Sequence, residues 1–128
     1  MYCLDTSAII KIFDGKEEIK KFLEKIQFSE ISITPITLCE LYKGAVHSKV
    51  TSRRLEFIER MMQQVTLLDF NEFSCKLFGE DYLNLKNNGK LISDNDLMIA
   101  AICKSHNKTL ITSDNDFDRV PGLIVQKI

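Results

Sequence analysis

The acidic residues of this chain fall in a pattern that could hold a metal ion. Asp5 follows a short apolar run, Glu40 interrupts an apolar helical segment, and Asp96 precedes the apolar end of LISDNDLMIAAI. Asp114 follows a further apolar run, TLIT. A set of oxygen ligands alone selects a hard cation such as Mg²⁺ or Mn²⁺. Such an ion polarises phosphoryl groups and activates water, so the pattern indicates phosphodiester hydrolysis.

The segments that carry these acids alternate between predicted strands and helices. Apolar runs predict strands at residues 2–4, 30–34, 65–70, 109–112 and 123–126. Apolar spacing predicts a helix after Asp5 and further helices at residues 15–28, 35–48, 52–64, 72–86 and 94–106. No hairpin turn separates two strands, so the pattern predicts βαβ units and a mostly parallel sheet covered on both faces.

This arrangement predicts where the acids meet. Ligands bind outside the carboxyl ends of the strands in an open parallel sheet. Asp5 and Asp114 both follow strands, so they should face each other if the first and fourth strands are neighbours. Four or five carboxylates at one edge would repel each other strongly without a cation.

Local signals bound the helices. Thr6 or Ser7 is expected to cap the first helix, and Asn88-Gly89 to end the long one. Apolar stripes are expected to bury several aromatic side chains. They include Tyr42 on the helix 35–48 and Phe73 on the helix 72–86.

Each acid also has a purely structural interpretation. Asp5 could cap a helix, although Thr6-Ser7 makes it redundant for that purpose. Asp94 and Asp96 compete for one position at a helix N-terminus, so one of them is spare. Asp114 could be an ordinary turn residue. The order of the acids and their common sheet edge favour a shared site.

Composition sets the broad class. The chain has 128 residues, 45% hydrophobic and 27% charged, which predicts one globular domain over residues 1–128. The formal net charge of −1 argues against a simple electrostatic DNA binder. We find no signal peptide and no apolar run of transmembrane length, so we expect a cytoplasmic protein away from membranes.

The cysteines do not indicate a zinc site. The four cysteines, at positions 3, 39, 75 and 103, form no C-x-x-C pair, and the chain has only two histidines. Each cysteine lies in an apolar segment, which predicts buried reduced thiols.

Four motifs together resemble a PIN-domain ribonuclease of the VapC-like toxin type. They are LDTSAII, ITPITLCELYKGA, GKLISDNDLMIAAI and TLITSDNDFDRVPGL, and they span the chain. The resemblance implies an α/β fold, a PIN-like three-layer α/β/α sandwich with a central five-stranded parallel sheet. It also implies Mg²⁺- or Mn²⁺-dependent cleavage of RNA.

The motifs imply the site residues one by one. Asp5, Glu40 and Asp96 match the first, second and third catalytic acids of the family, and Asp114 matches the fourth position. The resemblance makes Asp5, Asp96 and Asp114 the metal ligands. Glu40 would orient a water or help to bind a second ion. Asp94 matches no catalytic position.

Secondary positions also match. Asp116 corresponds to a further acidic position, Thr6 to a hydroxyl beside the first acid, and Thr112 to one beside the fourth. Ser113 stands where many relatives have arginine or asparagine.

The resemblance further implies partners: a structured RNA substrate, a cognate antitoxin protein and a second copy of the chain in a homodimer. RNA must be gripped by local positive patches. We expect Lys43, Arg53 and Arg54 to contribute, because their segment combines several cations with little acid.

Four other functions compete with this prediction. A haloacid-dehalogenase-type phosphatase needs D-x-D after its first strand, and this chain has DTSA there. A receiver domain needs a lysine near its acidic pocket, and the only late lysine is the nearly terminal Lys127. A PIN nuclease of RNA processing without a toxin role, or a non-catalytic metal- or RNA-binding module, would share the motifs.

Overall fold

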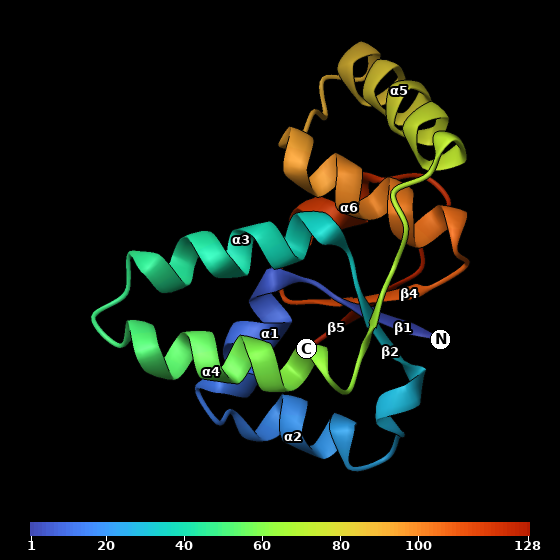
Figure 1. Cartoon of the computed structure of the whole chain (residues 1–128). Helices are drawn as coiled ribbons and strands as arrows, with labels where there is room; N and C mark the ends of the chain where they lie inside the picture. The colour runs from blue at the N-terminus through green and yellow to red at the C-terminus, as the bar shows by residue number, and fades with distance from the viewer.

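The computed structural model describes all 128 residues around one parallel sheet with the strand order β3-β2-β1-β4-β5 (Figure 1). Each pair of neighbouring strands is parallel, and β1 pairs with both β2 and β4. The strands are β1 (Tyr2–Leu4), β2 (Ile31–Ile33), β3 (Thr66–Leu67), β4 (Thr109–Thr112) and β5 (Val125–Lys127). The predicted five-stranded parallel sheet and the pairing of the first and fourth strands are confirmed.

Six α-helices and two short 3₁₀ turns connect the strands. They are α1 (Thr6–Phe13), α2 (Glu17–Leu23), η1 (Phe28–Glu30), α3 (Pro35–Val46), α4 (Thr51–Met62), α5 (Glu72–Asn87), α6 (Asp94–Ser105) and η2 (Asn115–Arg119). None of the helices combines the length and the apolar character needed to cross a bilayer.

The helices form a layer on each face of the sheet. Successive strand residues point to opposite faces. Cys3 therefore packs with α5 and α6, whereas Leu4 packs with α1, α3 and α4. Figure 1 shows α5 and α6 on one side of the strands and α1 to α4 on the other. The predicted α/β/α sandwich is confirmed.

Element boundaries differ where local polar groups compete with the apolar pattern. The helix predicted at residues 15–28 ends at Leu23. The backbone N–H of Gln27 then donates to Glu30 Oε2 at 2.8 Å, which stabilises η1 instead of a longer helix. The third strand shrinks to Thr66–Leu67, and the fifth begins two residues later than predicted, at Val125.

Some predicted core residues face solvent. Phe73 is 57% exposed and Tyr42 is 39% exposed. Cys39 and Cys75 are also exposed, so the prediction of four buried thiols is wrong for these two. The helices that carry these residues, α3 and α5, each bury only a narrow stripe of side chains. On α3 the stripe includes Leu41, and the adjacent Tyr42 lies about 100° further round the helix.

Candidate metal centre

The acids gather at the carboxyl edge of the two central strands. Leu4 at the end of β1 pairs with Ile111 of β4, so Asp5 and Thr112 lie side by side beyond it. The backbone N–H of Asp5 continues the ladder to Ile111 O at 3.2 Å. The sheet register thus places the start of α1 against the turn that follows β4.

Asp5 is buried and held by three hydrogen-bond donors. It is only 4% exposed. Its Oδ1 accepts from the Ala8 backbone N–H at 2.9 Å and from the Ser7 hydroxyl at 2.7 Å. Its Oδ2 accepts from the Thr112 hydroxyl. Asp5 is therefore the N-cap of α1.

The expectation that Thr6 or Ser7 caps α1 is wrong. The Thr6 hydroxyl donates instead to Glu40 Oε1 of α3 at 2.7 Å, and the Ser7 hydroxyl donates to Asp5. The residues that seemed to make Asp5 redundant as a cap are thus engaged with the acids themselves. Glu40 is half-buried, and its Oε2 makes no hydrogen bond to the protein.

The environment of Asp5 opposes its negative charge. Burial raises the pKa of the Asp5 carboxyl above its ordinary value. Hydrogen bonds from Thr112, Ser7 and Ala8 lower the same pKa, and the nearby charge of Asp114 raises it again. The net direction is upward, so the donors offset the cost of burial only in part.

Asp94 and Asp96 have different positions on α6. Ser93 is the N-cap, and its hydroxyl accepts from the Asp96 backbone N–H at 3.2 Å. Asp94 is the first helical residue and is exposed, whereas Asp96 is half-buried. The fully buried Leu97 and Ile99 anchor this turn in the core.

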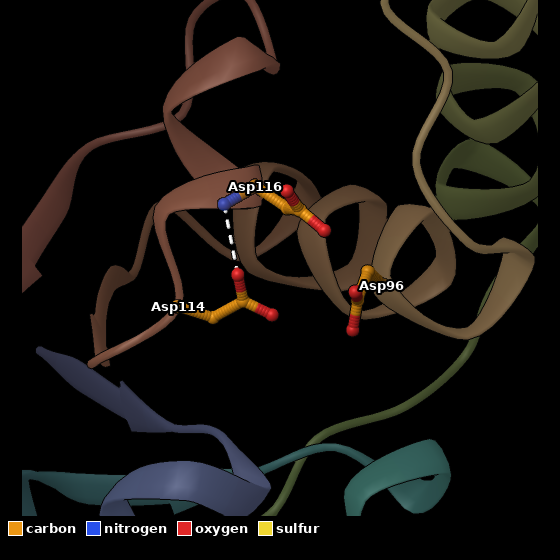
Figure 2. Close-up of side chains that lie close together, drawn as sticks. All are labelled: Asp96, Asp114 and Asp116. Carbon is orange, nitrogen blue, oxygen red and sulfur yellow. Dashed lines mark hydrogen bonds between the residues drawn. The ribbon is translucent and has the colours of Figure 1, made fainter.

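Three carboxylates converge on one point. Oxygen atoms of Asp96, Asp114 and Asp116 lie within 4.8 Å of one another, and all three residues are half-buried. Figure 2 shows Asp96 reaching from α6 toward the two aspartates at the start of η2. The Asp116 backbone N–H donates to Asp114 Oδ1 at 2.9 Å, which shapes this turn.

The charges of Asp5, which follows β1, and of Glu40, on α3, also act on this group. Burial, together with the nearby charges of Asp114, Glu40 and Asp5, raises the pKa of Asp96 from its ordinary 3.8 to about 6. Burial is the largest of these causes, and the Ser93 hydrogen bond acts against them. Asp96 therefore lies within the field of the other predicted acids.

The donor set fits a hard divalent cation. It consists of carboxylate oxygens close enough to share one ion, without nitrogen or sulfur. The single cation that pairs with the group is Arg119, whose guanidinium lies 3.7 Å from Asp116 Oδ1. Its guanidinium also donates to the Leu91 carbonyl at 3.2 Å. Lys127 Nζ also lies close, donating to the Asp114 carbonyl at 2.7 Å, but it pairs with none of the three carboxylates.

The structure brings the predicted acids to one edge of the sheet and gives Asp116 a more central place among them than the sequence predicted. Asp116, expected in a secondary role, belongs to the tightest carboxylate group, together with Asp96 and Asp114. Sequence reasoning missed the contact of Ser7 with Asp5. The signal was present in the spacing D-x-S directly after a strand, where a serine two residues on can reach back to an aspartate.

Of the candidate RNA-binding cations, Lys43 lies near one of the acids and the two arginines lie away from them. Lys43 is exposed on α3, one turn beyond Glu40. The guanidinium groups of Arg53 and Arg54 lie 5.8 and 5.0 Å from the ring centre of Phe13, at the far end of α1 from Asp5. Neither arginine forms an ion pair, and the buried Nε of Arg54 has no hydrogen-bond partner.

Named relatives match nearly the full length of this chain. Ribonuclease VapC2 of Haemophilus influenzae is 31% identical over 125 residues, covering 95% of this chain and 93% of the relative. The tRNA(fMet)-specific endonuclease VapC of Salmonella typhimurium is 27% identical, with 98% and 96% covered.

Solved structures share the fold. The VapBC2 structure from Rickettsia felis, bound to a DNA fragment from its promoter, superposes with a TM-score of 0.89 at 27% identity, over 99% of this chain and 98% of that one. VapBC-1 from nontypeable Haemophilus influenzae gives 0.87 at 32% identity, over 98% and 96%. The PIN domain family itself matches residues 2–123. With the sheet order, the acidic edge and these relatives in agreement, the chain belongs to the PIN domain family.

Proposed function

We propose that this chain is a metal-dependent endoribonuclease that acts as the toxin of a toxin–antitoxin pair. The observation that carries the proposal is the convergence of the Asp96, Asp114 and Asp116 carboxylates at the sheet edge beside Asp5. The ribonuclease names of its full-length relatives support the RNA substrate. The VapBC structures that share its fold support the toxin role.

In this proposal the acids divide the work. Asp96 and Asp114 hold Mg²⁺ or Mn²⁺, with Asp116 beside them. Asp5 contributes through Oδ2, which accepts a single hydrogen bond from the protein. A divalent ion held there would supply charge stabilisation for the phosphoryl oxygens and would lower the pKa of a bound water.

Glu40 is the acid best placed to orient the attacking water. Thr6 fixes one of its oxygens, Oε1, and leaves Oε2 without a protein partner. A carboxylate held in this way can accept a hydrogen bond from a water in a defined direction. Asp5 is buried and Asp96 is half-buried, so electrostatic interactions of these carboxylates are less screened by water than at an exposed surface.

Substrate grip is assigned to Lys43, Arg53 and Arg54. These cations have no ion-pair partners in the chain, and the exposed Lys43 and Arg53 are better placed to contact RNA phosphates than the half-buried Arg54. Lys43→Gln and Arg53→Gln should weaken RNA binding and each reduce its salt slope by about one. A slope unchanged in both variants would remove these residues from the RNA-binding surface.

The proposal includes the partners of a toxin. A cognate antitoxin would cover the acidic edge, and two copies of the chain would form a homodimer. A ribonuclease of this kind acts on cellular RNA, which places it in the cytoplasm and away from membranes. Residues 1–128 would then act as a single nuclease domain.

One experiment tests the reaction. Purified protein is incubated with total RNA, with and without Mg²⁺ or Mn²⁺, beside Asp5→Ala. We expect cleavage only with the ion and only in the wild-type chain. Cleavage in EDTA, or cleavage that survives the substitution, would contradict the mechanism.

A second experiment separates a toxin from an RNA-processing nuclease. Induced expression of the wild-type chain in a bacterial host should arrest growth, and Asp5→Ala should not. Normal growth during active RNA cleavage would favour a processing role.

A further inference from the structure

Ser7 connects two turns that are far apart in the sequence. Its hydroxyl lies at the start of α1 and donates to Asp5 Oδ1 at 2.7 Å. The same oxygen accepts the backbone N–H of Ser113 at 3.0 Å, across a separation of 106 residues. Ser113 follows β4 and precedes Asp114, and Asp116 comes two residues later in η2.

Proton counting fixes the direction of these bonds. Ser7 and Thr112 each have one hydroxyl proton, and both protons point to Asp5. Each hydroxyl oxygen in turn accepts a backbone N–H, from Ser113 and from Asp114 at 2.9 Å. With both protons used, the 3.3 Å contact between the two hydroxyl oxygens is a side-by-side contact. Two backbone amides of one turn thus reach Asp5 through two hydroxyls.

We propose that Ser7 is a positioning residue of the metal centre, which fixes the Asp5 carboxylate against the turn that carries Asp114. The inference rests on the proposed metal-dependent function. The Ser7 hydroxyl orients Asp5 by donating to its carboxylate, and the same oxygen holds the turn by accepting the Ser113 N–H. Loss of the hydroxyl therefore removes one restraint from a ligand carboxylate and one from the backbone that precedes Asp114.

A role in stabilising α1 alone does not explain these contacts. Asp5 already caps the helix by accepting the Ala8 N–H. Ser7 adds nothing to that cap and instead uses its donor on the carboxylate and its acceptor on a turn from the other end of the chain. Partners of ligand carboxylates of this kind affect metal affinity about 10- to 100-fold when removed.

The test measures metal affinity directly. Mn²⁺ and Mg²⁺ are titrated into the full chain by calorimetry without RNA. We expect Ser7→Ala to weaken binding about 10- to 100-fold. Ser7→Cys, which keeps the size but supplies a weak donor, should show a similar loss, and Ser7→Thr, which keeps the hydroxyl, should stay within about threefold of wild type.

Ser74→Ala is the matched control. Ser74 is a buried serine of α5 that bonds to Asn71 at 3.0 Å and to Ser105 at 2.7 Å, in the opposite helical layer. Its loss should lower the unfolding temperature and leave metal affinity within about twofold, since it touches no acid. In RNA cleavage, excess Mg²⁺ should restore the kcat of Ser7→Ala, and the KM for RNA should not change.

The outcomes separate this inference from the proposed function. Wild-type affinity in both Ser7→Ala and Ser7→Cys, or an equal loss in Ser74→Ala, overturns the positioning role. If Ser7→Ala does not fold, Ser7→Cys decides. A wild-type chain that binds neither ion overturns the role together with the metal site. Metal binding without RNA cleavage overturns only the proposed function.

Discussion

The carboxylates at the sheet edge form two halves, which differ in how the protein stabilises their negative charge. In the hydroxyl-bonded half, Asp5 and Glu40 are held by threonine and serine hydroxyls. In the open half, Asp96, Asp114 and Asp116 face one another within 4.8 Å, with one backbone N–H donated between them and one arginine at 3.7 Å. The first half is oriented by the protein itself, and the second is the half in which the proposed metal ion would balance the charge.

The difference follows from where each half comes from in the chain. Asp5 lies at the carboxyl end of β1, beside the end of β4, where the sheet register brings the Thr112 hydroxyl within reach. The open half brings together α6 and η2, which share no strand ladder. A shared ion would link these two elements and complete a site whose other side is already fixed.

The largest expected effect comes from neutralising the hydroxyl-bonded half. Asp5→Asn should reduce RNA cleavage by at least ~10²-fold, because it removes the negative charge of a carboxylate that the proposal makes a metal ligand. The asparagine oxygen can still accept the Ala8 N–H, so the cap of α1 survives. Cleavage assays with saturating Mg²⁺ measure this loss.

Asp5→Ala separates the cap from the chemistry. It should lose the same activity and also ~1 kcal/mol of stability, since alanine cannot cap α1. Chemical denaturation of the two variants gives the difference. Equal stability of Asp5→Asn and Asp5→Ala would mean that the cap does not matter.

The second effect concerns the open half. Asp96→Asn should lower RNA cleavage about 10²-fold, whereas Asp94→Asn, two residues away and exposed, should stay within about twofold. Both substitutions remove one charge from the first turn of α6, so the pair controls for the helix terminus. Equal loss in both variants would contradict the separate roles of Asp94 and Asp96.

The stability of the metal-free chain should depend on pH through the open half. Because the pKa of Asp96 rises from 3.8 to about 6 on folding, the folded chain binds more protons than the unfolded chain between these values. The free energy of unfolding should therefore fall as pH increases from about 4 to 7 and level off above. After allowance for solvent screening at this half-buried group, we expect a fall of ~1 kcal/mol.

Denaturation in EDTA at several pH values measures this slope, and Asp96→Asn is its control. The variant should lose the part of the slope that comes from Asp96 and be more stable than wild type at pH 7, while the raised pKa of Asp5 maintains the remainder. Mg²⁺ at 100 times its Kd should stabilise the wild-type chain by about 2.7 kcal/mol at pH 7. A wild-type slope of the opposite sign would show that the open half is balanced without an ion.

The fold and the position of the acids at the sheet edge could be predicted from the sequence, because both follow from the order of strands and helices along the chain. Alternating strands and helices led to a parallel sheet, and strand ends led to Asp5 and Asp114. Sequence reasoning failed at exposed positions such as Phe73, where the spacing of apolar residues overstated the width of the buried stripe. The helix α5 packs chiefly against α6, so a single narrow stripe is enough.

The division of the site into two halves could not be predicted from the sequence. Whether Ser7 caps a helix or holds an acid depends on the backbone at Asp5, which occupies the cap itself. The closeness of Asp116 to Asp96 depends on how η2 turns back over α6, which no local spacing specifies.

The smallest expected effect comes from Arg119, the one cation of the chain that pairs with the open half. If Arg119 balanced this charge, its removal would destabilise the metal-free chain strongly. Its distance of 3.7 Å from Asp116 and the half-exposure of both side chains predict a weak pair. Arg119→Gln should therefore change stability by less than ~1 kcal/mol and raise Mg²⁺ affinity by no more than about threefold. Calorimetric titration and denaturation in EDTA measure both values. A large loss of stability together with a large gain in affinity would mean that an internal arginine, and not a solution cation, completes the open half.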